Sequence, residues 1–265
     1  MCYDISFIVN IRELKNYFPT LLFDEGMEDA ETNLDASTHI IGHSYGDHPI
    51  IYSGREDKVL HCRFMEWGCI PYYIKDEKQF LRQRATMLNA RSERILGDDK
   101  SYWFKIRNRR CLIPVSGFYE HRTISGWKKK VPYFITLTNQ PVFFIPGLYS
   151  VAELPDAETG EVVKRWTYTL ITRPANELMK HIHNDGDNKW RMPLLLPFEM
   201  SKAFVADDLS PELYKDILHY EMPPEEMSYR PVFTIRSPKP RPDNKPKNEY
   251  WEWEKLPELG VGNPE

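Results

Sequence analysis

The chain has 265 residues and a net charge of −4, so it is not a polycation that coats nucleic acid along its whole length. Its 41% hydrophobic and 13% aromatic residues are enough to bury a core, and no apolar stretch approaches the length of a membrane span. No CxxC pair or zinc-finger spacing occurs, which favours a cytoplasmic protein with reduced thiols at Cys2, Cys62, Cys69 and Cys111.

The N-terminus reads Met1-Cys2-Tyr3-Asp4, and residues 3–9 alternate as a first strand would. If Met1 is removed during maturation, which a small second side chain permits, Cys2 carries a thiol and a free α-amine on adjacent carbons. Such an amine has a pKa of about 7.7–8.0, and its unprotonated form attacks aldehydes to give a Schiff base. The thiol can then close a five-membered thiazolidine ring. The alternative is an ordinary buried cysteine.

A short helix and a loop are predicted in the polar residues 11–38, which precede three histidines, His39, His43 and His48. Such a cluster is one candidate for metal binding. The intervening Gly42 and Gly46 and the following Pro49 indicate a loop or strand edge rather than a helical ligand face. We therefore expect no metal and no cofactor, and a metal protein stays an alternative.

A strand and turn are predicted over residues 59–74, which contain Trp67, and a helix over residues 75–95. Apolar residues recur at helical spacing in the second stretch. Arg84 and Arg91 lie on its other faces, where they form either a solvated basic face or a phosphate-contacting surface.

Arg109 and Arg110 lead into a predicted strand over residues 111–115, which is followed by Gly117-Phe118-Tyr119-Glu120-His121. A carboxylate among strand residues and aromatics is expected to be partly desolvated. Desolvation raises its pKa and suits it to proton transfer. The alternative for Glu120 is a strand residue in a salt bridge.

Residues 133–138 and 142–150 predict a β-hairpin, and residues 166–172 a further strand. The stretch from Thr172 to Asn176 predicts the start of a short helix that ends near His181–Asn184. Helices are also expected near 198–205 and 210–219, before a proline-rich, charged tail that wraps the surface or is mobile. This order predicts an α+β protein with one compact domain over residues 2–220 and a tail over 221–265.

Four separated segments match the motifs of one known family: Met1-Cys2, Asn89-Ala90-Arg91-Ser92-Glu93, Gly117-Phe118-Tyr119-Glu120, and Ile182-His183 with Arg191-Met192-Pro193. Together with Trp67-Gly68-Cys69-Ile70-Pro71, they resemble the SOS response-associated peptidase (SRAP) family, whose members shield abasic sites in single-stranded DNA. The resemblance covers roughly residues 2–220. It implies a mostly antiparallel β-barrel-like core flanked by helices, a positively charged groove, and a monomer that acts without a cofactor.

The resemblance also implies roles for individual residues. Cys2 forms a thiazolidine with the ring-opened sugar aldehyde, Asn89 holds the reacting centre, and Glu120 is the acid–base carboxylate. His183 lies beside the sugar, and AP-lyase activity accompanies capture if the Schiff base undergoes β-elimination. The DNA contacts it implies, extended to neighbouring arginines, are Trp67, Arg84, Arg91, Arg109, Arg110 and Arg191.

This sequence departs from the common pattern in two places. Tyr3-Asp4 replaces the Gly-Arg found in many members, which is expected to weaken or relocate a phosphate contact. Residues 184–190 separate His183 from Arg191, so His181 competes for the histidine role. Two other functions remain open: a thiol peptidase with Cys2 as nucleophile, at least on its own N-terminus, and a non-covalent module that binds single-stranded nucleic acid.

Overall fold

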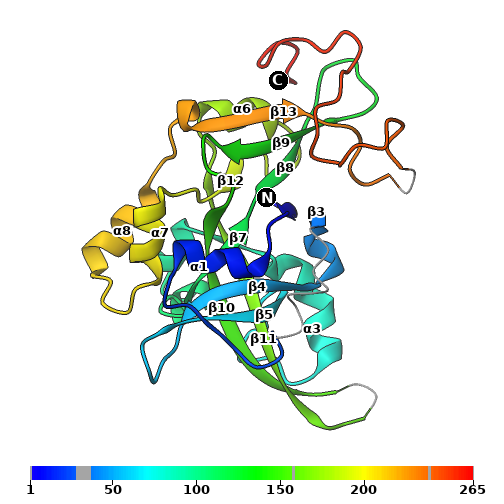
Figure 1. Ribbon diagram of the computed structural model, residues 1–265. Helices are drawn as coiled ribbons and strands as arrows, with labels where there is room; N and C mark the ends of the chain where they lie inside the picture. The colour runs from blue at the N-terminus through cyan, green and yellow to red at the C-terminus, as the bar shows by residue number, and fades with distance from the viewer. Residues whose placement is uncertain (1, 28–36, 157–158, 238–239, 265) are drawn as a thin grey trace.

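The computed structural model describes residues 2–27, 37–156, 159–237 and 240–264. Met1, whose removal is predicted above, lies outside the described residues, as does most of the predicted loop before His39. Two β-sheets dominate the fold, one closed and one open, with helices around them (Figure 1). The predicted α+β fold is therefore confirmed.

The closed sheet is a barrel. Its strands are joined in the order β11-β10-β7-β4-β5, and a parallel pairing of β5 with β11 at Glu66↔Thr167 completes the ring. Full closure leaves no free edge in the ring. The strands are β4 (Asp47–Ser53), β5 (Leu60–Trp67), β7 (Arg110–Val115), β10 (Phe143–Pro155) and β11 (Val162–Pro174).

The open sheet has the order β13-β9-β8-β1-β3 and lies above the barrel in Figure 1. Its strands are β1 (Asp4–Phe7), β3 (Ser37–Ile41), β8 (Gly117–Arg122), β9 (Val131–Leu137) and β13 (Met227–Pro231). Only Ser116 separates β7 from β8, so the chain passes directly from the barrel into this sheet. Gly117 permits the crossing, because a Cβ there would lie 2.2 Å from the ring of Phe134.

Short strands extend the barrel sheet: β2 (Leu22–Phe23), β6 (Asn89–Arg91) and β12 (Arg191–Pro193). The α-helices are α1 (Leu14–Tyr17), α3 (Glu77–Gln83), α4 (Glu93–Leu96), α5 (Tyr102–Lys105), α6 (Glu177–Ile182), α7 (Phe198–Val205) and α8 (Pro211–His219). Turns of 3₁₀ helix are η1 (Ile11–Glu13), η2 (Gly42–Ser44), η3 (Arg84–Met87) and η4 (Pro224–Glu226). Among the described residues, no helix is long and apolar enough to cross a membrane.

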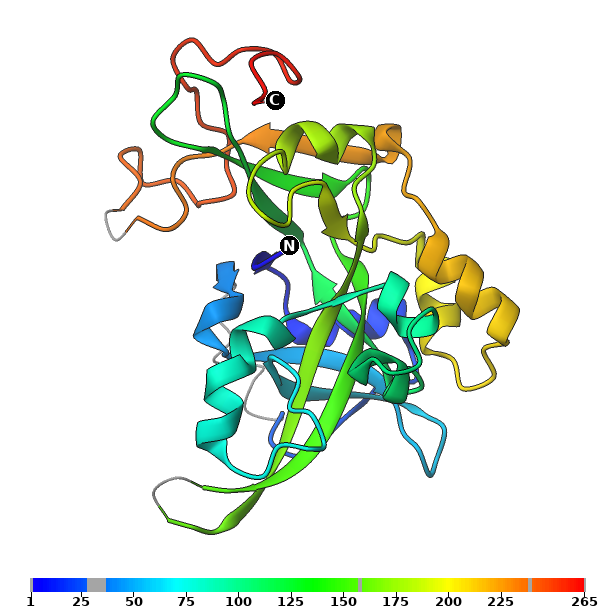
Figure 2. The same ribbon diagram turned by 180° about the vertical axis from the view of Figure 1, so that it is seen from behind.

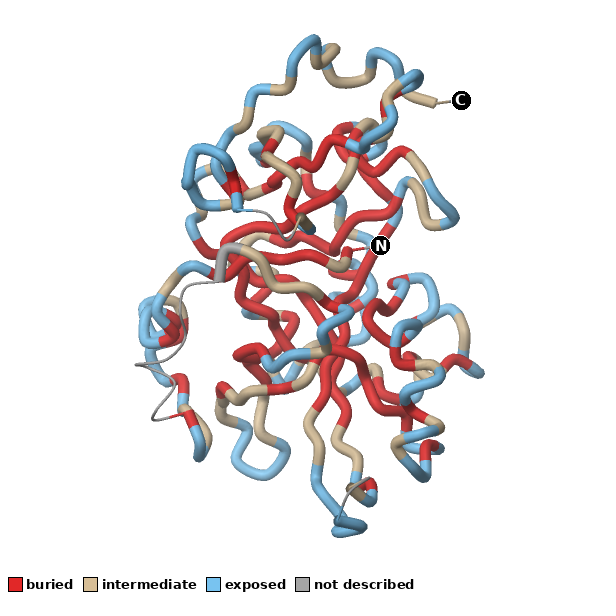
Figure 3. Tube along the Cα trace, turned by 90° about the vertical axis from the view of Figure 1, so that its right-hand side faces the viewer, coloured by how far each residue is buried: buried red, intermediate tan, exposed pale blue. Residues whose placement is uncertain are grey.

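The core lies inside the barrel and continues into the space between the barrel and the open sheet. Buried segments run through both sheets in Figure 3, whereas the loops at both ends are exposed. Seen from behind in Figure 2, β10 and β11 extend together beyond the barrel, away from the open sheet. Cys2 directly precedes β1 of the open sheet, and it packs in one buried cluster with residues of both sheets.

Three local predictions were wrong. Residues 75–95 do not form one helix: after α3 the chain turns through η3 into strand β6, which pairs with β11 and buries Asn89 and Ala90. Residues 133–138 and 142–150 do not form a hairpin, since β9 joins the open sheet and β10 joins the barrel. Strand β11 continues to Pro174, so the helix begins only at the end of the predicted stretch, with Asn176 as its cap. In each case long-range pairing overrides the local pattern.

The segment predicted as a tail is bound to the domain. Strand β13 forms the edge of the open sheet, and the side chains of Trp253, Leu256 and Leu259 pack against the core. Arg122, which is fully buried, donates hydrogen bonds to the carbonyls of Pro257, at 3.0 Å, and Glu258, at 2.8 Å. The chain from residue 240 to 264 therefore wraps the surface of the open sheet.

Candidate functional site

Cys2 lies fully buried directly before β1, among residues of both sheets. The side-chain amide of Asn89 donates a hydrogen bond of 2.9 Å to the Cys2 carbonyl. Asn89 comes from β6, which β11 holds in parallel register at Leu170. Burial raises the pKa of the Cys2 thiol well above its ordinary value, so the sulfur is protonated near neutral pH. The structure thus brings Cys2 and Asn89 together.

Glu120 reaches the same place from β8, which pairs with β1 at Ile5↔Phe118. Its side chain is buried, and burial raises its pKa to about 8. Glu120 Oε1 and Asn89 Oδ1 are both buried and have no hydrogen-bond partner among the described residues. Buried acceptors are rarely left without a partner, and here both belong to predicted site residues.

His183 follows α6 and turns its ring toward Glu120, with 3.9 Å between His183 Nε2 and Glu120 Oε2. Its Nδ1 lies 2.8 Å from the carbonyl oxygen of Arg191. The main-chain N–H of Arg191 also points at Nδ1, at 3.3 Å. The shorter contact is with the carbonyl oxygen, which only accepts, so it favours the tautomer with the proton on Nδ1 and the lone pair of Nε2 toward Glu120. His181, the competing residue, contacts Asn263 instead, at 3.1 Å. The ring of His183, not that of His181, faces the site.

The protonation states of the two groups follow from their burial. Burial lowers the pKa of His183 to about 4, and it raises that of Glu120 to about 8. Near neutral pH the site therefore holds a neutral imidazole and a protonated carboxylic acid. Environments that move two pKa values apart are typical of acid–base sites.

Beside these groups opens a cavity of about 360 Å³, which we call the site cavity. Glu120 and His183 line it, together with Asp4, Lys130 and Arg236. Arg236 donates to both carboxylate oxygens of Asp4, at 3.1 and 2.6 Å, and His39 contacts the same carboxylate at 2.8 Å. Burial alone would raise the pKa of Asp4, but hydrogen bonds from His39 and Arg236 hold it below its ordinary value.

Sequence analysis did not find Lys130 or Arg236. Arg236 belongs to the segment that was predicted as a tail, more than 200 residues from Cys2 in the chain. The unusual Asp4 was the available signal, because a buried carboxylate needs a cation. The structure supplies that cation from the other end of the chain.

Of the predicted DNA contacts, Arg91 is exposed next to the site cavity and donates to Asn188, which lines that cavity, at 3.0 Å. Trp67 is only 1% exposed, and its indole donates to the carbonyl of Leu88 and stacks on Tyr168. Arg84 is buried against Glu66. Both side chains are closed into the core, so this burial gives no support to direct DNA contact by either residue, which stays a prediction.

Three further arginines were predicted to contact DNA. Arg191 is buried and pairs with Glu93, and it also donates 2.8 Å to the carbonyl of Thr172. Arg110 donates to the carbonyl of Phe204 in α7, at 2.7 Å, and to that of Ala206 just after it, at 2.5 Å. Both arginines hold elements together, and a DNA contact by either stays a prediction. Arg109 is partly exposed and lines a different cavity.

The three histidines that suggested metal binding separate in the fold. His39 contacts Asp4, His43 packs on Tyr3 with 4.6 Å between ring centres, and His48 lies buried against the carbonyl of Pro114 at 2.8 Å. Within the described part of the chain, no group of three or more His, Cys, Asp or Glu side chains is placed to hold a metal.

Known proteins of similar sequence share one description. Abasic site processing protein YoaM of Bacillus subtilis is 30% identical over 233 residues, which cover 88% of each chain. YoqW of the same organism is also named an abasic site processing protein. It is 30% identical over 72% of this chain and 76% of its own chain. The yeast protein YMR114C, also named an abasic site processing protein, is 32% identical over 64% of this chain, which spans only 41% of that relative.

Solved structures share the fold. A protein from Bacteroides thetaiotaomicron superposes with a TM-score of 0.77 at 25% identity over 95% of this chain and 100% of that one. A protein from Bordetella bronchiseptica superposes with a TM-score of 0.64 at 19% identity, over 88% of this chain and 100% of its own. The family model "SOS response associated peptidase (SRAP)" matches residues 1–235. This chain therefore belongs to the SRAP family, as the resemblance predicted.

Proposed function

We propose that this protein captures abasic sites in single-stranded DNA by forming a covalent bond through Cys2. The observation that carries the proposal is the convergence of four residues from separate segments. Asn89 bonds the Cys2 carbonyl, and the charge of Glu120 acts on the Cys2 thiol. Glu120 in turn faces His183, and these two line the site cavity. The relatives named abasic site processing proteins supply the substrate class.

The chemistry requires a free Cys2 amine, which removal of Met1 provides. The amine nitrogen attacks C1′ of the ring-opened abasic sugar, and the aldehyde oxygen leaves as water to give a Schiff base. The thiol sulfur then bonds to C1′, the C=N pair returns to nitrogen, and nitrogen takes up the thiol proton. The product is a thiazolidine, and one water is lost overall.

The residues around Cys2 match these proton transfers. Glu120 is protonated near neutral pH and donates the proton that turns the departing oxygen into water. His183 Nε2, with its lone pair toward Glu120, accepts a proton during ring opening. Asn89 holds the Cys2 main chain and directs a free acceptor oxygen into the same region.

Cations around the cavity fit a strand of nucleic acid. Lys130 and Arg236 line the site cavity, where Lys130 is paired with Asp185 at 2.8 Å, and Arg91 lies at its edge beside Asn188. We propose that they contact the phosphates next to the abasic sugar, with Arg236 taking the role expected of an arginine at position 4. Asp4 fixes the guanidinium of Arg236, which leaves its other edge for a phosphate oxygen.

Two other activities follow less directly. AP-lyase action needs the Schiff base to persist, and thiazolidine closure removes it, so we propose lyase activity as a minor branch. A thiol peptidase needs a thiolate, whereas burial keeps the Cys2 sulfur protonated. Removal of Met1 is the one peptidase step that the proposal requires, and the proposal does not assign that step to the Cys2 thiol.

A denaturing gel tests the proposal. Protein with intact-mass confirmation of a free Cys2 is incubated with a single-stranded oligonucleotide that carries one abasic site. We expect a shifted, heat-resistant band for the wild type and for Cys62→Ala, which removes another buried thiol, and none for Cys2→Ala. If Cys2→Ala binds the DNA as tightly as wild type and neither protein gives a band, the chain is a non-covalent binding module.

A further inference from the structure

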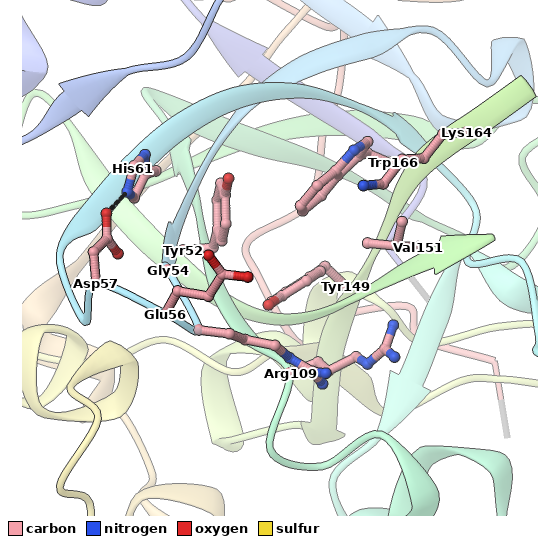
Figure 4. Close-up of a pocket in the computed structure, with 11 residues that line it drawn as sticks. Tyr52, Gly54, Glu56, Asp57, His61, Arg109, Tyr149, Val151, Lys164 and Trp166 are labelled. Atoms are coloured by element: carbon pink, nitrogen blue, oxygen red, sulfur yellow. Dashed lines mark hydrogen bonds and ion pairs between the residues drawn. The ribbon is translucent and has the colours of Figure 1, made fainter. Parts of the chain in front are cut away.

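A second cavity, of about 440 Å³, opens at the end of the barrel, and we call it the barrel-mouth cavity. It is lined by residues of β4, β5, β10 and β11 and by the turn after β4 (Figure 4). It shares no lining residue with the site cavity, and none of Cys2, Asn89, Glu120 and His183 lines it. The proposed capture of abasic sites therefore leaves the barrel-mouth cavity unused.

Three aromatic rings form one wall of the cavity. Tyr149 and Trp166 lie nearly parallel, at 17° with 5.9 Å between ring centres, and Tyr52 lies 5.3 Å from each of them. The wall is held in place by two contacts. The Tyr52 hydroxyl donates a hydrogen bond of 2.8 Å to Asp24, and the guanidinium carbon of Arg63 lies 4.7 Å from the ring centre of Trp166. A flat, held aromatic surface of this kind is suited to stacking against a planar ring.

Three cations from separate segments surround that wall: Arg55 in the turn after β4, Arg109 before β7, and Lys164 in β11. Lys164 and Arg109 lie on different sides of the aromatic group in Figure 4. Within the described part of the chain, none of the three forms an ion pair, whereas the neighbouring Arg63 is paired with Asp24 at 2.6 Å. Unpaired cations beside an aromatic wall are arranged for an anion.

The carboxylates on this rim do not cancel that charge. Glu56 and Asp57 belong to the same turn, but Asp57 is held by His61 at 2.8 Å, and hydrogen bonds from Asp57 and Asp24 raise the pKa of His61 despite its partial burial. The cations therefore outnumber the carboxylates that remain available.

We propose that the barrel-mouth cavity is a nucleotide-binding site. The base stacks on the wall of Tyr52, Tyr149 and Trp166, and the phosphate is held by the cations that line the cavity, Arg55, Arg109 and Lys164. The volume lies within the range of about 300–1,000 Å³ that is typical of small-molecule sites. The same chemistry is offered by a free mononucleotide and by a terminal nucleotide of a DNA strand.

Isothermal titration tests the site with three ligands: deoxyadenosine monophosphate, deoxyadenosine, and deoxyribose 5-phosphate. We expect the nucleotide to bind about tenfold or more tightly than either fragment, since each lacks one of the two interactions. The double variant Arg55→Ala/Lys164→Ala should weaken nucleotide binding by a similar factor. The matched control, Lys78→Ala/Arg82→Ala, removes two exposed cations outside the cavity and should bind as wild type.

Trp166→Ala tests the wall, and Trp166→Phe, which restores a ring, should recover most of the affinity. A 5′-phosphorylated hexadeoxynucleotide distinguishes the two sources. If it competes with the mononucleotide, the site holds the end of a strand, and if it does not, the site is specific for free nucleotides. Lack of binding at millimolar nucleotide, or equal affinity in wild type and Arg55→Ala/Lys164→Ala, overturns the proposal. Crosslinking to abasic DNA should be unchanged in Arg55→Ala/Lys164→Ala. Failure of the nucleotide-site proposal can therefore be distinguished from failure of the proposed capture through Cys2.

Discussion

Replacing Glu120 with Gln keeps the size of the side chain but removes its ability to ionise. Burial raises the pKa of Glu120 from 4.5 to about 8 in the folded protein. Between these two values the folded state holds a proton that the unfolded chain has released, so wild-type stability falls as the pH rises. Because one pKa unit corresponds to about 1.4 kcal/mol, this carboxyl removes roughly 5 kcal/mol of stability, as an upper bound, between about pH 4.5 and pH 8.

Denaturant unfolding from pH 5 to pH 9, at fixed ionic strength, measures this effect. We expect Glu120→Gln to gain stability relative to wild type as the pH rises, with a plateau above pH 8. The opposite contribution of His183, whose lowered pKa makes stability rise between about pH 4 and pH 6.5, is common to both proteins and cancels in the difference. The exposed Glu254→Gln variant should run parallel to wild type. A Glu120→Gln curve that is also parallel refutes the assigned protonation state.

The same variant should crosslink abasic DNA about 100-fold more slowly at pH 7, because an amide cannot supply the acidic proton. Asn89→Ala should slow single-turnover crosslinking about tenfold or more with little change in DNA affinity, and equal rates would contradict its role. Arg236→Ala, measured by fluorescence anisotropy in a Cys2→Ala background, should weaken single-stranded DNA binding several-fold and reduce its salt dependence; an unchanged salt slope would exclude a phosphate contact. Arg122→Ala should cost about 3 kcal/mol or more and expose residues 250–264 to limited proteolysis, whereas a tail that stays protected would contradict its anchoring.

Glu120 and His183 could be selected from the sequence because each lies in a short segment with its own pattern. Glu120 lies in a strand that begins at a glycine, and His183 is the C-terminal cap of a helix. Local sequence also indicated α7 and α8, whose apolar spacing is regular. These features depend on neighbours in the chain, and the structure confirms those helices and places the two residues side by side.

The features that sequence missed depend on residues far apart in the chain. The pairing of β5 with β11 closes the barrel across 100 residues, and the pairing of Asp4 with Arg236 spans the whole domain. The arginines that were predicted to contact DNA also have partners that are distant in the chain. Arg84 and Arg191 carry the charge that DNA requires, but Arg84 pairs with a glutamate and Arg191 donates to a main-chain carbonyl, which composition alone does not reveal.

Intact-mass measurement of the protein–DNA product tests the central claim most directly. Protein with a free Cys2 is mixed with a single-stranded oligonucleotide that carries one abasic site, in the absence of reductant. We predict one product at the summed masses less one water, with the DNA mapped to Cys2. Cys2→Ala keeps the amine but lacks the thiol, so it should retain DNA only when borohydride is added. A product from Cys2→Ala without reductant, or none from confirmed free Cys2, would contradict the account.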